Sequence, residues 1–340
     1  MSVSTKNKTL VDEFVNLYKN NHQILENSAN GIVNIHRKDA IQKFASWGFP
    51  DKKNEKYKYT SIEPVFSNPY KKYFQPKTPH FNEKDIFHCD VPEMHTDVYM
   101  VLNGWFFDRK ELLKVLPGGA ILGSFAAAAK NYPDIFEKYY ARIAEKSRDS
   151  LVALNTAFTQ DGLFLFVPKG VVIERPIQII NILLTEENRM VQPRNLIIAE
   201  ENSQAKIVFC DHSLAPKEYL TNSVTEVFAG KNARLDLISV QNEHNGSSKV
   251  SSNFLKLEND ANVSSTTITL HGGFIRNNFY THLSGKGSIS NINGLFLADR
   301  GQHIDNYVYI YHARPNCNSN QLIKGVLDDF ASGAFSGKTL

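Results

Sequence analysis

The back half of the chain, from about Val171 to Leu340, consists of short runs in which apolar and polar residues alternate. In the run 307–311, three tyrosines would face one way while Val308 and Ile310 face the other. Alternation with a period of two is typical of a β-strand that buries one face. Gly, Asn, Asp and Ser separate the runs, and these residues favour tight turns. We therefore predict a long succession of strands without helices between them.

Three of these strands line up in a fixed repeat. Ala205, Ala233 and Ala261 each follow a small or turn-forming pair and begin an alternating strand, and they are equally spaced along the chain. A weaker match falls at Ser288, one position short of the same spacing. A period made only of strands is typical of a β-solenoid, in which coils stack on one another. We predict a mainly β chain with a β-solenoid core, and the alternative is a β-sandwich.

The front half has a different pattern. Apolar residues at helical spacing predict an amphipathic helix over residues 9–24 and a second helix over residues 37–47. The pair Asn103-Gly104 lies between two apolar runs and predicts a β-hairpin. We therefore divide the chain into a mostly helical N-terminal region with a small hairpin, residues 1–150, and a β core, residues 151–340.

Two further helices are expected close to this boundary. Ser124 is a suitable N-cap for a helix over residues 125–130, and Pro133 should end it. A second helical stripe then continues over residues 134–146.

Composition excludes several classes of protein. The 38 basic and 35 acidic residues nearly balance, at a net charge of +3, which argues against a dedicated nucleic-acid binder. The cysteines are few, odd in number and far apart: Cys89, Cys210 and Cys317. This spacing argues against a disulfide framework and favours a reducing compartment. No apolar run has the length of a signal peptide or a bilayer span, so we expect a cytoplasmic protein without membrane contact.

The C-terminus contains an apparent phosphate-binding motif. Gly337-Lys338-Thr339 matches the end of a P-loop, but Ser332 stands where its first glycine should be. Only Leu340 follows, so no helix can form behind the loop to bind phosphate. We interpret this segment as a strand of the solenoid.

Metal-ligating residue types are present but poorly spaced. Histidines in the strand region are His212, His244, His271, His282, His303 and His312. Cys210 would share a strand face with His212, and Cys317 follows shortly after His312, so both pairs could offer metal ligands. Neither forms a recognised spacing, and lone cysteines in strands are usually core residues. We find no nucleophile elbow, His-Glu-x-x-His motif or clear carboxylate pair, and we predict no catalytic residue.

Three segments together resemble the SufD family of the SufB/SufD superfamily, which contains scaffold subunits of the SUF iron–sulfur cluster assembly machinery. They are GFPDKKNEKYKYT over residues 48–60, LVALNTAFTQDGLFLFVPKGVVIERPIQI over residues 151–179 and HARPNCNSNQLIKGVLDDFASGAFSGK over residues 312–338. The resemblance implies a right-handed parallel β-helix core after an N-terminal helical region. It also implies a subunit that is not an enzyme and that pairs with a SufB-like homologue and a SufC-like ATPase.

The resemblance places the cofactors at the level of a complex. Sulfur would come from a cysteine desulfurase, a nascent iron–sulfur cluster would form in the complex, and reduced flavin would supply electrons in some systems. We expect no intrinsic cofactor in this chain alone, and its cofactor-binding and metal-binding residues are unknown.

The sequence differs from the family at its end. The family continues beyond the position of Leu340 with more β-helix, a segment similar to Cys-Ser-His-Gly-Ala and a C-terminal helical domain that holds SufC. We therefore expect a C-terminally truncated chain, for which docking of SufB and SufC is open, and we transfer no cluster ligand to it. His312 and Cys317, near the open end of the stack, are candidates for residues close to the SufB interface.

Two other functions would also suit a β-solenoid. A carbohydrate-active enzyme would need clustered acids, whereas Asp236, Glu226 and Glu258 are scattered along the sequence. A purely structural interaction solenoid would differ only in its partners.

Overall fold

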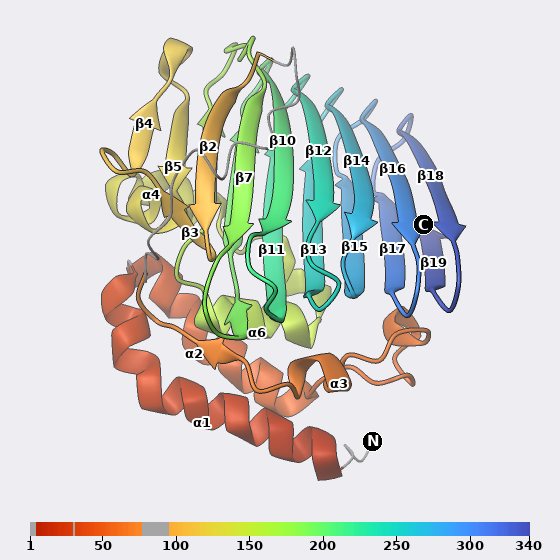
Figure 1. The fold of residues 1–340 in the computed structure, drawn as a ribbon. Coiled ribbons are helices and arrows are strands. Elements are labelled where there is room, and N and C mark those ends of the chain that lie inside the picture. Colours follow the sequence, from red (N-terminus) through yellow and green to blue (C-terminus); the bar gives the residue numbers. More distant parts are fainter. Residues whose placement is uncertain (1–4, 30, 77–94) are drawn as a thin grey trace.

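The computed structural model describes residues 5–29, 31–76 and 95–340. Two long sheets face each other and form a solenoid, and helices lie along one side of it (Figure 1). Sheet A has the spatial order β19 (Ser332–Thr339), β17 (His303–His312), β15 (Phe274–Leu283), β13 (Ser248–Leu257), β11 (Tyr219–Ala229), β9 (Arg194–Ala199), β6 (Leu163–Val167), β5 (Ile121–Ser124) and β4 (Leu113–Val115). Sheet B has the order β18 (Asn318–Leu327), β16 (Ile289–Ala298), β14 (Asn262–His271), β12 (Arg234–Asn242), β10 (Gln204–Ser213), β7 (Ile177–Leu183), β2 (Asp97–Leu102) and β3 (Trp105–Phe107).

Successive coils pair in parallel, each contributing one strand to each sheet. Gln204 of β10 pairs with Arg234 of β12, and Ser248 of β13 pairs with Phe274 of β15, so each strand pairs with the next strand but one along the chain. Parallel pairing of strands this close in sequence is the pattern of stacked coils. The β-solenoid prediction is confirmed, and the β-sandwich alternative is wrong.

One corner of the coil repeats with particular regularity. Each turn contains a residue with positive φ, namely Asn202, Asn232, Asp260, Gly287 and Asn316. Asn, Asp and Gly adopt this left-handed conformation most readily, which explains the recurrence of these types. The next residue in each coil is small and lies at the edge of the core, as Ser203, Ala233, Ala261, Ser288 and Cys317.

This corner corrects part of the predicted repeat. Ala233, Ala261 and Ser288 occupy it as expected, but Ala205 pairs with Leu235, two residues further along the strand. The true counterpart of Ala233 is Ser203, which also follows a positive-φ asparagine. The first coil is longer because β10 and β11 each have one residue more than β12 and β13.

The space between the sheets is filled mainly by aliphatic side chains that point inward from every coil. Ala205, Leu235 and Val263 form such a row across sheet B, and all are buried. This continuous core joins the coils into one body.

Helices and short strands outside the stack cover the outer face of sheet A. They are α1 (Thr5–Ser28), α2 (Gly31–Trp47), a 3₁₀ turn at Glu55–Tyr57, α3 (Glu63–Phe66), β1 (Lys71–Lys72), α4 (Phe125–Asn131), α5 (Pro133–Tyr139), a 3₁₀ turn at Ala144–Ser147 and α6 (Ser150–Phe158). The short strand β8 (Arg189–Val191) joins β1 to β11 of sheet A, and a 3₁₀ turn at Pro117–Gly119 connects β4 to β5. Their apolar side chains pack on outward residues of sheet A, such as Leu220 and Val250 under one cluster and Leu196 and Ile198 under another. We call residues 125–158 together with residues 5–29 and 31–72 the helical layer.

Most predicted local elements are present. The two N-terminal helices extend a few residues beyond the predicted bounds, Asn103 and Gly104 form the turn between β2 and antiparallel β3, and the Ser124 side chain accepts a hydrogen bond from the Ala127 N–H at the start of α4. Residues 337–339 lie in β19, which pairs with β17 as a solenoid strand. The apparent P-loop is therefore not a loop before a helix.

Two helices differ from the prediction. Helix α6 is not predicted by periodicity, because every one of its residues is buried and no side of the helix is left to be polar and exposed. The helix expected over residues 134–146 ends at Tyr139, for a reason found at the site described next.

Candidate functional site

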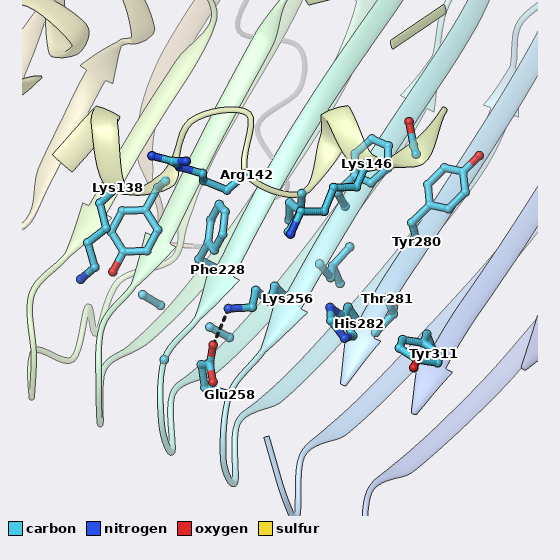
Figure 2. A pocket seen from close by; sticks show the side chains of 18 of the residues that line it. Lys138, Arg142, Lys146, Phe228, Lys256, Glu258, Tyr280, Thr281, His282 and Tyr311 are labelled. Carbon is cyan, nitrogen blue, oxygen red and sulfur yellow. Dashed lines mark hydrogen bonds and ion pairs between the residues drawn. The ribbon is translucent and has the colours of Figure 1, made fainter. Parts of the chain in front are cut away.

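A groove lies between residues 138–147 of the helical layer and the outer face of sheet A. It encloses about 840 Å³ and crosses β9, β11, β13, β15 and β17 (Figure 2). This volume is in the range of pockets that bind small ligands. The wall comes from the helical layer and the floor from the strands.

The wall is held in place by the Glu226 carboxylate of β11. Its oxygens accept hydrogen bonds from the backbone N–H groups of Ala141 at 2.9 Å, Ile143 at 3.1 Å and Ala144 at 3.0 Å. Ala141 has a φ of 62°, which is incompatible with a continuing helix. The chain therefore leaves helical geometry after Tyr139 because its amides bind a buried carboxylate instead of helical carbonyls.

Arg194 neutralises this carboxylate. Its guanidinium donates to Glu226 at 2.7 Å, and both side chains are fully buried. A second donation, to the Thr156 hydroxyl at 3.0 Å, ties the pair to α6. A buried charge requires such a partner, because desolvating it alone costs several kcal/mol.

The floor of the groove consists of two rows of side chains in register across the strands. One row is Phe228, Lys256, His282 and Tyr311, and the other is Phe254, Tyr280 and Tyr309, which is in register with the buried Glu226. The rings of Phe254 and Tyr280 stack with centroids 4.8 Å apart and planes within 7°. The ring centroids of His282 and Tyr311 lie 5.3 Å apart. The floor is thus largely aromatic.

Basic side chains line the rim and floor. Lys138 contacts Glu200 at 3.3 Å, and Lys256 contacts Glu258 at 2.7 Å. Lys146 extends from the wall toward the floor, where Lys256 and His282 lie (Figure 2). The surface therefore combines aromatic rings with several cations.

Burial lowers the pKa of the His282 imidazole, and the ammonium groups of Lys256 and Lys146 lower it further. The ring is consequently neutral at pH 7, so one of its nitrogens donates a hydrogen bond and the other accepts one.

A second cluster clamps the segment 48–60 to the last coils of sheet A. The Arg276 guanidinium donates to the Asp305 carboxylate and to the backbone oxygen of Lys56, and the Thr60 hydroxyl also donates to Asp305. The distinctive Lys- and Tyr-rich segment thus has a structural role, as the N-terminal anchor of the helical layer.

A third cluster of charges lies inside the solenoid. The Lys249 ammonium contacts Asp211 at 2.5 Å and Glu243 at 3.3 Å, and all three side chains are buried. Burial raises the pKa of Glu243, against the opposing effect of Lys249. One lysine between two carboxylates keeps the net charge of this interior small.

The predicted interface candidates His312 and Cys317 lie on either side of one corner in the last coil. His312 ends β17, and its Nε2 contacts the Ser319 hydroxyl at 2.9 Å. Cys317 occupies the small-residue corner position, where its thiol donates to the backbone oxygen of Gly285 at 3.1 Å. Both contacts are local and structural, and whether either residue lies at an interface stays a prediction.

The other candidate ligands are not brought together. Cys210 is buried on sheet B near Gln178, at 3.6 Å, and burial lowers the pKa of nearby His212. Within residues 5–29, 31–76 and 95–340, no three His, Cys, Asp or Glu side chains converge to hold a metal ion. Cys89 lies outside the described residues.

The three acids considered for a carbohydrate site are also separated. Asp236 is exposed on sheet B, Glu226 is buried behind the groove wall and Glu258 pairs with Lys256 at a corner. They do not form a shared cleft.

The sequence alone indicates little of the groove. Of its floor residues only His282 is singled out, as one histidine among six. The signal that could have found the floor is the repeat itself, because Phe228, Lys256, His282 and Tyr311 recur once per coil at the same register position. Recognising that column requires the correct register, because the spacing between its members changes from one coil to the next.

Comparison with known families defines the class. Residues 8–179 match the SufBD protein N-terminal region, and residues 182–340 match the SufBD core domain of the SUF system for FeS cluster assembly. Together the two regions span nearly the whole chain and the whole described stack. The chain belongs to the SufBD family of iron–sulfur cluster assembly proteins.

Individual relatives are more distant. A SufBD family protein of Synechocystis sp. is 23% identical over 259 residues, covering 74% of this chain and 57% of the relative. SufD of Bacillus subtilis is 26% identical over 225 residues, covering 64% and 51%. SufB of the same organism is 28% identical over 219 residues, covering 61% and 45%. The chain spans about half the length of the curated relatives it matches.

Among the helices that the structure describes, none combines the length and apolar character needed to cross a bilayer.

Proposed function

We propose that this chain is a SufD-like scaffold subunit of the SUF machinery that pairs with a SufB-like homologue and a SufC-like ATPase. The observation that carries the proposal is that both SufBD regions match in order along one uninterrupted stack of coils. SufB and SufD of Bacillus subtilis align at similar identity and do not separate the two assignments. The SufD-like assignment rests on the motifs over residues 48–60, 151–179 and 312–338.

These motifs account for architecture rather than chemistry, which supports a non-catalytic role. The first anchors the helical layer through Thr60, the second runs from α6 into β7, and the third builds the last coil. Iron, sulfide and electrons would be handled in the assembled complex as its cargo. The proposed setting is the cytoplasm, where free thiols stay reduced.

The test is co-expression of the natural full-length protein with its SufB-like and SufC-like partners, followed by affinity purification through a tag on this chain. We expect a stable complex that transfers clusters to an apo-ferredoxin faster than the SufB-like protein alone, measured by visible circular dichroism. Absence of both the complex and the faster transfer would overturn the proposal. The same purification is repeated with a SufD-like homologue in place of the SufB-like one. If this chain binds only the SufD-like homologue, it takes the place of SufB and not of SufD.

The candidate interface residues have their own test in the same complex. His312→Ala and Cys317→Ser should slow cluster assembly if their side chains lie near the interface. Asp328→Asn, an exposed change in the same coil, is the control. Normal assembly with both variants would remove His312 and Cys317 from consideration.

A further inference from the structure

The groove over sheet A has features that a scaffold role leaves unassigned. Its cations outnumber its acids, since Lys138, Arg142, Lys146 and Lys256 face only Glu200 and Glu258. Each acid already pairs with one lysine. An excess of positive charge in a partly enclosed space attracts anions.

The excess is concentrated at one place. Lys146 contacts no carboxylate among the described residues, and its chain extends over the floor toward Lys256 and His282 (Figure 2). Both ammonium groups lie near enough to His282 to lower the pKa of its imidazole. Two ammonium groups and a neutral ring N–H can donate hydrogen bonds to the oxygens of one anion.

The surface beside this point is aromatic. Tyr311 is 44% exposed, and Tyr280 and Tyr309 lie on the same floor. Flat rings with free faces favour stacking with another planar ring. An inorganic anion would make no contact with these rings, so the surface favours a ligand that contains an aromatic ring as well as an anionic group.

The dimensions suit a small molecule. Five strands spaced by about 4.8 Å give a floor about 19 Å long, and the volume of about 840 Å³ matches it. Both are in the range of a ligand with a ring system and one charged group.

We propose that the groove binds a small molecule that joins a planar aromatic ring to a phosphate or carboxylate. The anionic group would lie between Lys146, Lys256 and His282, and the ring would lie on Tyr309 and Tyr311. This site does not depend on the proposed scaffold function, and it can be tested on the isolated chain.

The test uses two charged probes, 1-naphthyl phosphate and 1-naphthoic acid, each of which joins an aromatic ring to an anionic group. Inorganic phosphate, which has the anionic group alone, and uncharged 1-naphthol, which has the ring alone, are the controls. Calorimetric titration should show one site, at which the better of the two charged probes binds at least about tenfold more tightly than either control. The preferred probe identifies the anionic group. Equal affinities for the charged probes and 1-naphthol would overturn the proposal.

Variants locate the site. Lys146→Ala should weaken binding of the charged probe about tenfold and leave 1-naphthol unaffected. Tyr311→Ala should weaken both aromatic probes. Lys206→Ala removes an exposed lysine from sheet B and is the matched control, with no expected effect.

Lys146 is itself exposed, so its replacement should preserve the fold, which far-UV circular dichroism will check. Equal weakening by the Lys146 and Lys206 variants would place the probe elsewhere and refute the site.

Discussion

The two sheets of the solenoid are built alike but covered differently. On sheet A, outward residues such as Val224, Ser252 and Asn278 are buried beneath the helical layer. On sheet B, outward residues of β14 and β16 such as Ser264 and Asn291 stay partly exposed. The same coil therefore presents one covered face and one open face.

The difference shows where charge can be placed in such a fold. The covered face contains the buried pairs Arg194–Glu226 and Arg276–Asp305, each of which also holds backbone of the helical layer. On the open face, Asp236 and Lys206 face solvent and require no partner. These two buried ionic pairs on sheet A are thus attachment points, whereas Asp236 and Lys206 on sheet B keep the surface solvated.

The largest expected effect comes from breaking an attachment point. Glu226→Ala would leave the Arg194 charge and three backbone amides buried without their acceptor, and we expect the free energy of unfolding to fall by about 3–5 kcal/mol. Urea denaturation followed by circular dichroism measures it. Glu201→Ala, which removes a carboxylate at a coil corner, should leave the transition where it is. A fall of less than about 1 kcal/mol for Glu226→Ala would contradict the assigned role of this carboxylate.

A matched pair of substitutions compares the faces directly. Ser252→Lys introduces a charge beneath the helical layer and should cost more than about 3 kcal/mol, since no partner is available there. Ser264→Lys, at an outward position of sheet B, should change stability by less than about 0.5 kcal/mol. Thermal and urea unfolding of both variants would test this. Similar losses would mean that the two faces are equally covered.

The second attachment point should be weaker. Asp305→Asn replaces the acceptor shared by Arg276 and Thr60 with a neutral amide, and we expect a loss of about 2 kcal/mol. Hydrogen exchange should also become faster over residues 55–60, because their anchor is lost. Unchanged exchange in that segment would show that packing alone holds it.

The smallest effect concerns pH. Burial lowers the pKa of His282 and of His303, both on the covered face. Their folded pKa values therefore lie below the unfolded value near 6.5, so the unfolded chain binds more protons as the pH falls through that value. The contribution of these two histidines to stability should therefore decrease modestly from pH 7.5 to pH 5.5, while the raised pKa of Asp161, about 6, acts in the opposite direction. The charged groups that act on His282 are Lys256, Lys146, Glu258 and Arg314.

Urea midpoints at the two pH values, compared between the wild type and His282→Gln, would measure this contribution. The variant should show a smaller decrease. A midpoint that changes with pH in the same way in the wild type and in His282→Gln would contradict the assigned direction for His282.

Much of the fold could be predicted because its signals are local. Alternation survives on the open face, as in β14, and turn-forming residues recur at the coil corners. On the covered face the alternation is lost: almost every residue of β11 and β13 is buried, since both their faces have neighbours. Periodicity therefore predicts the coil but not which face is covered.

The site could not be predicted for a different reason. The helical stripe over residues 134–146 is a valid local signal, but Glu226, far along the chain in β11, captures the amides that would continue the helix. The groove wall takes this shape because the Glu226 carboxylate, and not the carbonyl oxygens of a continuing helix, accepts the hydrogen bonds of these amides. No feature of the segment itself indicates it.

The helical layer has one more consequence, for cooperativity. Coils that touch only their neighbours would open one at a time, as in a linear array. Here α4 packs on β9, Glu226 of β11 binds residues 141–144, and Thr60 reaches Asp305 of β17. These contacts join coils that do not touch each other into one unfolding unit, so a molecule that loosens the layer at one point would lower the opening free energy of several coils together.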